Sequence, residues 1–395
     1  MAVKGIYVSD AGALNERNEG LANTILSEAR GSAVPLFALS AGLAEENASG
    51  AVFSWYEEGI WTTRSVITAV PAPGTGNLLT VEDSSWITEN MVMMIESTGE
   101  YIMVLGVTNN VLTVQRGISG TQVSPIVIGG TEQALQLIGT AFEEASERPT
   151  AVATSPFPRT NMTEIFRRAW DISGTAQATQ TKFGNRLDRN KATAGMMHAL
   201  DMEYALLWGK RHQGVINNKP IRLMDGVLAQ LRSNIFVGPA GGLTRRSLDD
   251  FVERLFSKNI KGQPNERISF CGNAAIRALN EITMRYGSYN IQAKENEFGI
   301  EVFTFITPFG RLTLAPHPLM NDSPIFSSEL YTLHPAAMSM VWLRKTFHLD
   351  EGQNGGSSDL RDAKAGVFTS ELSVKYAVES TGAIMTGITV DHFEP

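Results

Sequence analysis

The chain has 395 residues, of which 43% are hydrophobic and 19% charged, and its formal net charge is −8. That length gives enough apolar surface for two or three domains with real cores. The acidic balance, with only short basic pairs such as Arg167-Arg168 and Arg245-Arg246, argues against a protein that grips nucleic acid through its phosphates. The single cysteine, Cys271, excludes a disulfide framework. Because we find neither a secretory signal nor a membrane-spanning apolar stretch, we expect a cytosolic location.

Residues 1–48 are predicted to form an extended arm, because small residues together with Asn, Ser and Gly dominate them. The apolar segment 34–43 is too short to fold alone, yet its Leu36, Phe37 and Leu39 argue against full solvation. We therefore expect the arm to lie on a surface of its own domain or of a neighbour, with disorder as the alternative.

Aromatic residues are dense between positions 50 and 63, where Trp55, Tyr56 and Trp61 follow a pattern typical of a strand. A Pro- and Gly-containing break follows at 71–74. Next comes a predicted all-β insertion over 75–130, with strands at 77–81, 100–107 and 111–117, a tight turn at Asn109-Asn110, and a helical pattern afterwards over 132–146.

Residues 156–178 are predicted to be extended and to lead into the longest helical pattern of the chain, 185–213. Asn185 or Asp188 can cap its first turn, and Gly214 is a plausible stop. A helix of this span is roughly 40 Å long. It is either a core helix or a beam that carries sheets at its ends, and the flanking strands favour the beam.

Strands then alternate with helices, which predicts one compact α/β or α+β layer domain. Thr244 is predicted to cap the first of these helices. The predicted elements are helices over 247–258 and 274–286, strands at 267–271, 329–335 and 338–344, a hairpin over 298–318 turned at 308–310, a loop over 351–359, a strand over 367–379, and a partner strand for it over 381–390.

The sequence contains no motif for catalysis, cofactor binding or metal binding. Phosphate-binding loops, nucleophile elbows and Cys or His pairs at metal spacing are all missing. The adjacent acids Glu143-Glu144 and Asp249-Asp250 are interpreted as solvated helix faces. We therefore expect no enzyme activity, no catalytic, cofactor or metal residues and no cofactor, with a site assembled from scattered residues as the alternative.

Several stretches together resemble the major capsid proteins of tailed phages that have the Hong Kong 97 fold, and most closely the SU-ten-like subgroup. The segments that carry the resemblance span most of the chain: TNMTEIFRRAWDISGTAQAT (160–179), ALDMEYALLWGK (199–210), GEYIMVLGVTNNVLTVQRGISGT (99–121), GRLTLAPHPLM (310–320), ELYTLHPAAMSMVWLRKTF (329–347) and ELSVKYAVESTGAIMTGI (371–388). The Gly-rich loop 350–366 departs from the pattern of the family, which leaves its placement open.

The resemblance implies an α+β capsid fold with an all-β insertion domain. Its implied parts are an N-terminal arm (1–48), an extended loop with adjoining segments (49–74 and 131–184), the β insertion (75–130), a peripheral domain with the long spine helix (185–219 and 366–395) and an axial domain (220–365). The expected assembly contacts are Leu36, Phe37, Leu39, Trp55, Tyr56, Trp61, Arg167, Arg168 and Trp170.

The resemblance further implies self-assembly as hexamers and pentamers into an icosahedral shell around double-stranded DNA. The virion capsid would be its final location and the host bacterial cytoplasm its place of assembly. Expected partners are further copies of the chain, a portal, a scaffold, a decoration protein in some versions of the shell, and DNA held without sequence-specific contact. No membrane partner is expected. The alternatives are a tail or baseplate structural protein and a cytosolic α/β enzyme.

Some relatives join their subunits by isopeptide bonds between a lysine of the extended loop and an asparagine of a neighbour. After Lys4 the next lysine of this chain is Lys182, which lies at the base of the extended loop near the spine helix, so the rest of the loop and its insertion contain none and Lys182 is the one exception. Arginine cannot replace the amine, because its guanidinium stays protonated. We therefore expect this shell to lack such bonds.

Overall fold

The computed structural model describes residue 36 and residues 43–59, 62–70, 76–128, 133–149, 151–153, 155–179, 185–286, 290–297, 300–350 and 362–389. The chain divides into two compact units. One unit joins Met1–Trp55 to Arg159–Pro395, and the other is Tyr56–Pro158. Both helices and sheets are present, so the predicted α+β class is confirmed.

The smaller unit contains a closed antiparallel barrel with the strand order β3-β4-β7-β6-β5-β8. Asn109 adopts a left-handed conformation (φ 52°) in the turn between β6 and β7, as predicted. The strands are β3 (Arg64–Ala69), β4 (Leu78–Val81), β5 (Met91–Ile95), β6 (Tyr101–Thr108), β7 (Val111–Gln115) and β8 (Ala134–Thr140).

The barrel is larger than the insertion predicted over 75–130, since β3 and β8 lie outside that range. The helix predicted over 132–146 is wrong, because residues 134–140 form β8 instead. This strand pairs with β3 on one side and β5 on the other, and so removes the last two open edges of the sheet. Pairing between distant segments thus overrides the local helical pattern.

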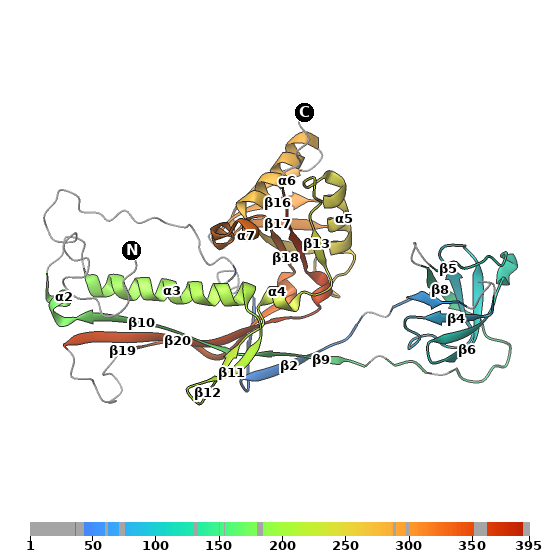
Figure 1. Cartoon of the computed structure of the whole chain (residues 1–395), viewed down its shortest axis with the longest axis horizontal. Helices are drawn as coiled ribbons and strands as arrows, with labels where there is room; N and C mark the ends of the chain where they lie inside the picture. Colours follow the sequence, from blue (N-terminus) through green and yellow to red (C-terminus); the bar gives the residue numbers. More distant parts are fainter. Residues whose placement is uncertain are drawn as a thin grey trace. The chain divides into compact units, whose positions relative to one another are not determined.

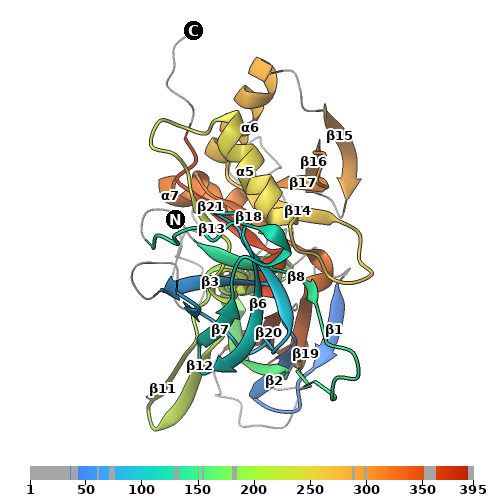
Figure 2. The same ribbon diagram turned by 90° about the vertical axis from the view of Figure 1, so that its right-hand side faces the viewer.

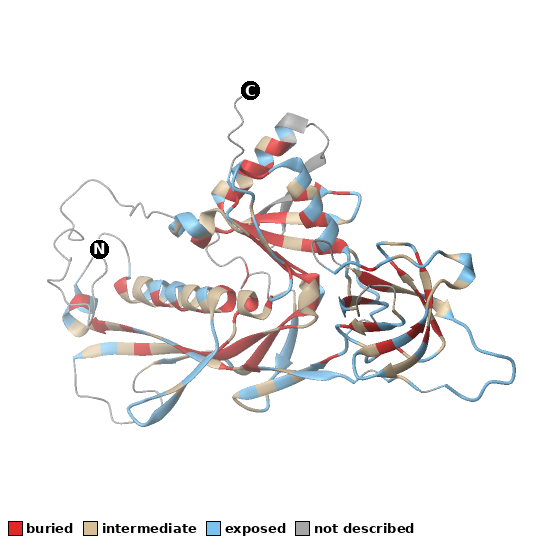
Figure 3. Ribbon diagram, turned by 45° about the vertical axis from the view of Figure 1, so that its right-hand side comes forward, coloured by how far each residue is buried: buried red, intermediate tan, exposed pale blue. Residues whose placement is uncertain are grey.

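Apolar side chains fill the inside of the barrel. Buried residues alternate with more exposed ones along β5 and β7, the period expected when one face of each strand turns inward. Figure 3 shows buried and more exposed stretches within the barrel.

In the smaller unit the carboxylate of Glu100 accepts hydrogen bonds from Arg116 and from the backbone N–H groups of Gly117 and Ser124. Burial raises the pKa of Glu100, but these bonds outweigh it and lower the pKa overall.

The larger unit is built on a four-stranded sheet with the order β1-β19-β20-β10. The long helix α3 (Arg186–Trp208) lies along this sheet and contacts β10 and β20 (Figure 1). The strands are β1 (Ala44–Asn47), β10 (Glu164–Ser173), β19 (Met338–Asp350) and β20 (Ala363–Tyr376). The extended segment predicted before the long helix is therefore confirmed, apart from the short helix α2 (Gly174–Ala178) at its end.

Helix α3 begins where the sequence predicted and ends five residues earlier. The Asn185 side chain accepts a hydrogen bond from the N–H of Leu187 and caps the helix. At the other end, a Cβ on Gly209 would lie 2.4 Å from the carbonyl oxygen of Ala205 and 2.9 Å from that of Met224. Only glycine fits this crossing of two backbones, so the helix stops at Trp208 and not at residue 213.

The chain beyond the helix forms a hairpin that the sequence analysis did not predict. Its strands β11 (His212–Ile216) and β12 (Lys219–Leu223) are joined by Asn217 and Asn218, both left-handed (φ 50° and 57°). Two consecutive left-handed residues make a type I′ turn, whose twist matches that of the strands. The hairpin projects from its unit in Figures 1 and 2.

A second sheet of seven strands has the order β13-β21-β18-β14-β17-β16-β15. Helices α5 (Arg245–Phe256) and α6 (Asn273–Tyr286) share one core cluster with it, and Thr244 caps α5 as predicted. The hairpin predicted over 298–318 is also confirmed. The strands are β13 (Ile235–Val237), β14 (Glu266–Cys271), β15 (Asn290–Glu297), β16 (Ile300–Ile306), β17 (Arg311–Pro316), β18 (Leu330–Leu333) and β21 (Ala383–Thr386).

The predicted pairing of the last two strands is wrong. Strand β20 belongs to the four-stranded sheet, whereas β21 pairs with β18 and β13 in the seven-stranded sheet. A left-handed residue at Val378 (φ 56°) and the following 3-10 turn redirect the chain between the two sheets. The C-terminal strands therefore contribute to both sheets.

The two sheets share one hydrophobic core. Helix α3, the short helix α4 (Val227–Gln230), and residues from both sheets pack into a single cluster, which makes this unit one folding body. Representative members are Met202, Leu206, Phe166, Leu372, Phe270, Tyr331 and Leu333.

Candidate assembly interface

The only residue of the predicted arm patch that the structure describes, Leu36, is anchored within its own chain. Its side chain is 1% exposed and belongs to the core shared by the two sheets. Its backbone N–H donates a 2.8 Å hydrogen bond to Oε1 of Glu203 on α3. Phe37 and Leu39 lie outside the described residues. The arm is thus fixed to its own subunit at Leu36.

A two-stranded ribbon of β2 (Val52–Glu57) and β9 (Phe157–Met162) carries the predicted aromatic residues. Phe53 and Trp55 stack with their ring centroids 5.9 Å apart, and Tyr56 is 70% exposed. Trp61 lies outside the described residues. A two-stranded ribbon is marginally stable by itself, so these aromatic side chains are poised for contact with another surface.

The three predicted interface residues on β10 lie on two opposite faces of the strand. Arg168 forms a bidentate ion pair with Asp201 on α3, at 2.6 and 2.9 Å. Trp170 is buried, and its indole N–H donates to Nε2 of His348. Arg167 is exposed on the opposite face. The alternation of a strand could have shown this, because odd and even positions must face opposite ways.

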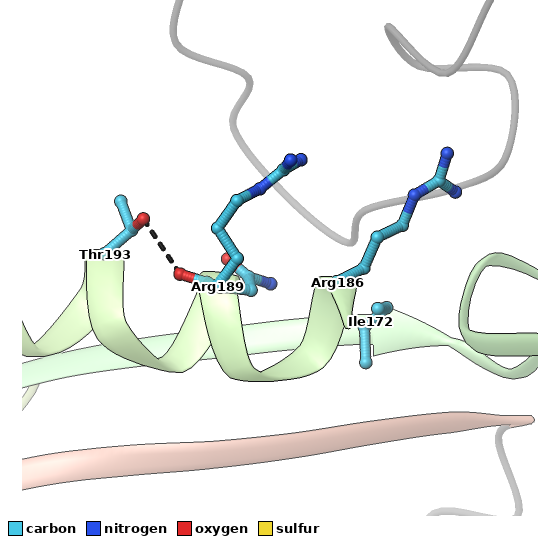
Figure 4. Close-up of a pocket in the computed structure, with 5 residues that line it drawn as sticks. Ile172, Arg186, Arg189 and Thr193 are labelled. Carbon is cyan, nitrogen blue, oxygen red and sulfur yellow. Dashed lines mark hydrogen bonds between the residues drawn. The ribbon is translucent and has the colours of Figure 1, made fainter. Parts of the chain in front are cut away.

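Two arginines project from the first turns of α3 beside a small hollow of about 190 Å³. Figure 4 shows Arg186 and Arg189 leaving the helix on the same side, while the hydroxyl of Thr193 donates to the carbonyl of Arg189. Arg186 is 6% exposed, and its Nη1 donates to the carbonyl of Ala176. The hollow is smaller than the usual ligand pocket of about 300–1,000 Å³, and two arginines line it.

Large apolar side chains are exposed at several separate places on the larger unit. Where such side chains are contiguous, they mark surfaces for contact with another protein. They lie on the edge strand β13, along α3 and on the β11–β12 hairpin. The most exposed on these three elements are Val237 (79%), Val215 (70%), Met196 (59%), Ile216 (56%) and Ile235 (54%). Met284 (78%) on α6 and Ile325 (68%) are exposed elsewhere on the same unit. Neither the hairpin nor the β13 edge was predicted from the sequence.

The net charge of the chain resides entirely in the smaller unit. The whole sequence has 33 basic and 41 acidic side chains. Residues 56–158 contain 3 of the basic and 11 of the acidic ones, which leaves 30 basic and 30 acidic side chains for the larger unit. The smaller unit therefore carries the full net charge of −8, and the larger unit is neutral overall.

Among the described residues, no cluster of three or more His, Cys, Asp or Glu side chains has a geometry that could hold a metal ion. Cys271 is fully buried, and burial raises the pKa of its thiol to about 12. No described helix is long and apolar enough to cross a membrane.

Comparison with known proteins gives a match over almost the whole chain. The family described as SU10 major capsid protein matches residues 12–389. The major capsid protein of Pseudomonas phage PaMx41 is 28% identical over 393 residues, which cover 94% of this chain and 92% of that protein.

Solved capsid structures align along the same length at low sequence identity. The Mycobacterium phage Bobi structure has a TM-score of 0.48 and 9% identity, and the match covers 98% of this chain and 99% of that one. The capsid of cyanophage P-SCSP1u has a TM-score of 0.47 and 9% identity, with 94% and 93% covered.

The α+β chain combines an arm anchored at Leu36, a two-stranded ribbon, a closed barrel and several exposed apolar side chains, and these parts give it the character of a structural protein. The chain belongs to the SU10 major capsid protein family. It is the major capsid protein of a tailed phage and is located in the virion capsid. A non-enzymatic, structural role follows from membership of this family.

Proposed function

We propose that the chain assembles as hexamers and pentamers into a closed icosahedral shell around the double-stranded DNA genome, without catalysing a reaction. The observation that carries this proposal is the β2–β9 ribbon with its exposed aromatic residues. The ribbon has no third strand among the described residues, and a hairpin-sized sheet needs packing against another surface to be stable. A neighbouring subunit supplies that surface.

Within this proposal, Trp55, Tyr56 and Arg167 remain interface residues, whereas Leu36, Arg168 and Trp170 have contacts within the subunit. Phe37, Leu39 and Trp61, which lie outside the described residues, also remain proposed interface residues. The expected arm, extended loop, peripheral domain and axial domain remain proposals as capsid parts. Assembly takes place in the host cytoplasm, together with a portal and a scaffold.

The charge distribution suits a container for DNA. A neutral larger unit and an acidic smaller unit give no overall attraction to the phosphate backbone, so the genome is enclosed without being gripped. Sequence-specific contact with the DNA is not part of the proposal.

Size-exclusion chromatography of the purified protein followed by negative-stain imaging tests the proposal. Closed particles are expected, with loss of particles in Tyr56→Ser and retention in Tyr56→Phe, which keeps the ring. A discrete monomer or dimer under every assembly condition would contradict a shell, and rings or tubes would favour a tail protein.

A further inference from the structure

The β11–β12 hairpin presents an apolar face that its own subunit leaves open. In its register, His212 lies opposite Leu223, Gly214 opposite Ile221, and Ile216 opposite Lys219. These six residues share one face because each pair lies two positions from the next. Ile216 is 56% exposed and Leu223 39% exposed.

The other face of the hairpin contacts the subunit near the base of the hairpin, whereas Val215 on the same face, toward the tip, is 70% exposed. Arg222 lies on that face, and its guanidinium is 3.6 Å from the carboxylate of Glu371 on β20. Nearby, Arg211 donates to the hydroxyl and the carbonyl of Thr160 on β9. These contacts hold the base of the hairpin to its subunit, while Ile216 and Lys219 near the tip stay exposed.

The charged residues of the hairpin and its flanks are all basic. Residues 209–224 contain Lys210, Arg211, Lys219 and Arg222 and not one acidic residue. The two arginines have the partners just described, whereas the exposed Lys210 and Lys219 make no ion pair within the part of the chain that the structure describes. The outward face therefore combines apolar side chains with uncompensated positive charge at its edge.

The matching surface in the same protein is the end of the acidic barrel. The N–H of Ala141 donates a 2.9 Å hydrogen bond to the carbonyl of Asn90, so the segment after β8 lies beside Glu89. That segment exposes Glu143, Glu144 and Phe142, the last at 41%. It too combines acids with an apolar side chain, and it belongs to the unit that carries the whole net charge of −8.

We propose that the β11–β12 hairpin is a docking surface for the acidic barrel end of a second copy of this chain. Ile216, Ile221 and Leu223 meet Phe142, while Lys210 and Lys219 face Glu89, Glu143 and Glu144. The inference rests on the proposed self-assembly and adds a specific contact to it. Charge complementarity of this kind guides the encounter and fixes the register of an interface more than it adds affinity.

Charge reversal in the full chain tests the contact. Lys210→Glu with Lys219→Glu is expected to lower the yield of shells about tenfold, because like charges then face each other. Glu143→Lys with Glu144→Lys is expected to do the same, and the four changes together to restore the yield. Lys258→Glu with Lys261→Glu, at two exposed lysines after α5, is the matched control and should leave the yield unchanged.

Carbodiimide cross-linking identifies the occupant, because it joins a lysine amine to a carboxylate that lies against it. Shells assembled from a mixture of isotope-labelled and unlabelled subunits should give a Lys219–Glu143 or Lys219–Glu144 peptide pair that combines both labels. Residues 5–181 contain no lysine, so such a link cannot arise within the barrel unit itself.

Three results would overturn the inference: normal shell yield from the lysine reversal, no rescue by the fourfold variant, or links only between peptides of the same label. A lysine reversal that forms normal empty shells but loses packaged DNA would assign the hairpin to nucleic acid instead. Failure of the unaltered chain to form any shell would reject the proposed function, which is distinguishable from all of these.

Discussion

The carboxylate of Glu203 and the imidazole of His317 form a fully buried pair, with 2.8 Å between Oε1 and Nε2. The same oxygen accepts the N–H of Leu36. The ring of His317 also lies edge-on to Trp208 and Phe270, with centroids 6.1 and 5.7 Å away. The buried pair therefore links the spine helix α3, the segment that follows β17 of the seven-stranded sheet, and the arm at Leu36.

Glu203→Ala should destabilise the subunit by about 3–5 kcal/mol, because it leaves a buried imidazole and a buried N–H without an acceptor. Asp201→Ala on the same helix is the control. It removes an ion pair whose side chains are 37% and 41% exposed, and such pairs contribute about 1 kcal/mol or less. Urea unfolding of the soluble subunit measures both, and equal losses would show that the buried pair has no special role.

His334 should make the fold sensitive to mild acid. Burial, together with the charge of Arg267, lowers the pKa of its imidazole from 6.5 to about 4. In the unfolded chain the imidazole of His334 is therefore protonated below about pH 6.5, whereas in the folded chain it stays neutral down to about pH 4. Stability is complete above pH 6.5 and is lost as the pH falls toward 4, by up to about 3 kcal/mol.

The variant His334→Asn checks this effect. Nδ1 of His334 accepts the N–H of Ala336, a role that an asparagine side chain can keep while it removes the titration. The slope of unfolding free energy between pH 4 and 6.5 should decrease. It should not vanish, because burial also lowers the pKa of His198. An unchanged slope would mean that His334 does not titrate differently on folding.

Removal of the barrel should succeed only when all of its strands are removed. Replacing residues 60–150 by a Gly/Ser linker deletes β3 to β8 together and should leave the larger unit folded. Replacing only 75–130 leaves β3 and β8 without β4 and β5, which exposes apolar strand edges and favours aggregation. Solubility and thermal unfolding compare the two variants, and the reverse order of stability would contradict the barrel topology.

The sequence predicted features that depend on near neighbours. The caps at Asn185 and Thr244 and the turn at Asn109 are set within a few residues, so local chemistry suffices. It did not predict closure of the barrel by β3 and β8, whose pairing joins segments about seventy residues apart in the chain. Element types were therefore more predictable than partners.

The candidate interface also depends on pairings between distant residues, which the sequence did not predict. Arg168 and Trp170 were expected to be assembly contacts, but their partners Asp201 and His348 lie on other elements of the same chain. His317 precedes a proline in the sequence, and its partner Glu203 is 114 positions away. No periodicity in the sequence links such residues, so only the folded chain reveals them.

Shells of this protein should contain no covalent bonds between subunits. Residues 5–181 provide no lysine amine, and Lys182 lies outside the described residues. Particles boiled in detergent should give a single band near 43 kDa. A ladder of multimers that disappears in Lys182→Arg would show that this lysine forms the bond.

Cryo-electron microscopy of particles formed by the purified chain tests the central claim most directly. The account predicts a closed shell with rings of six and of five copies, in which the β2–β9 ribbon of each copy lies against its neighbour with Tyr56 buried. Open tubes, or shells in which the ribbon and Tyr56 stay in solvent, would contradict it.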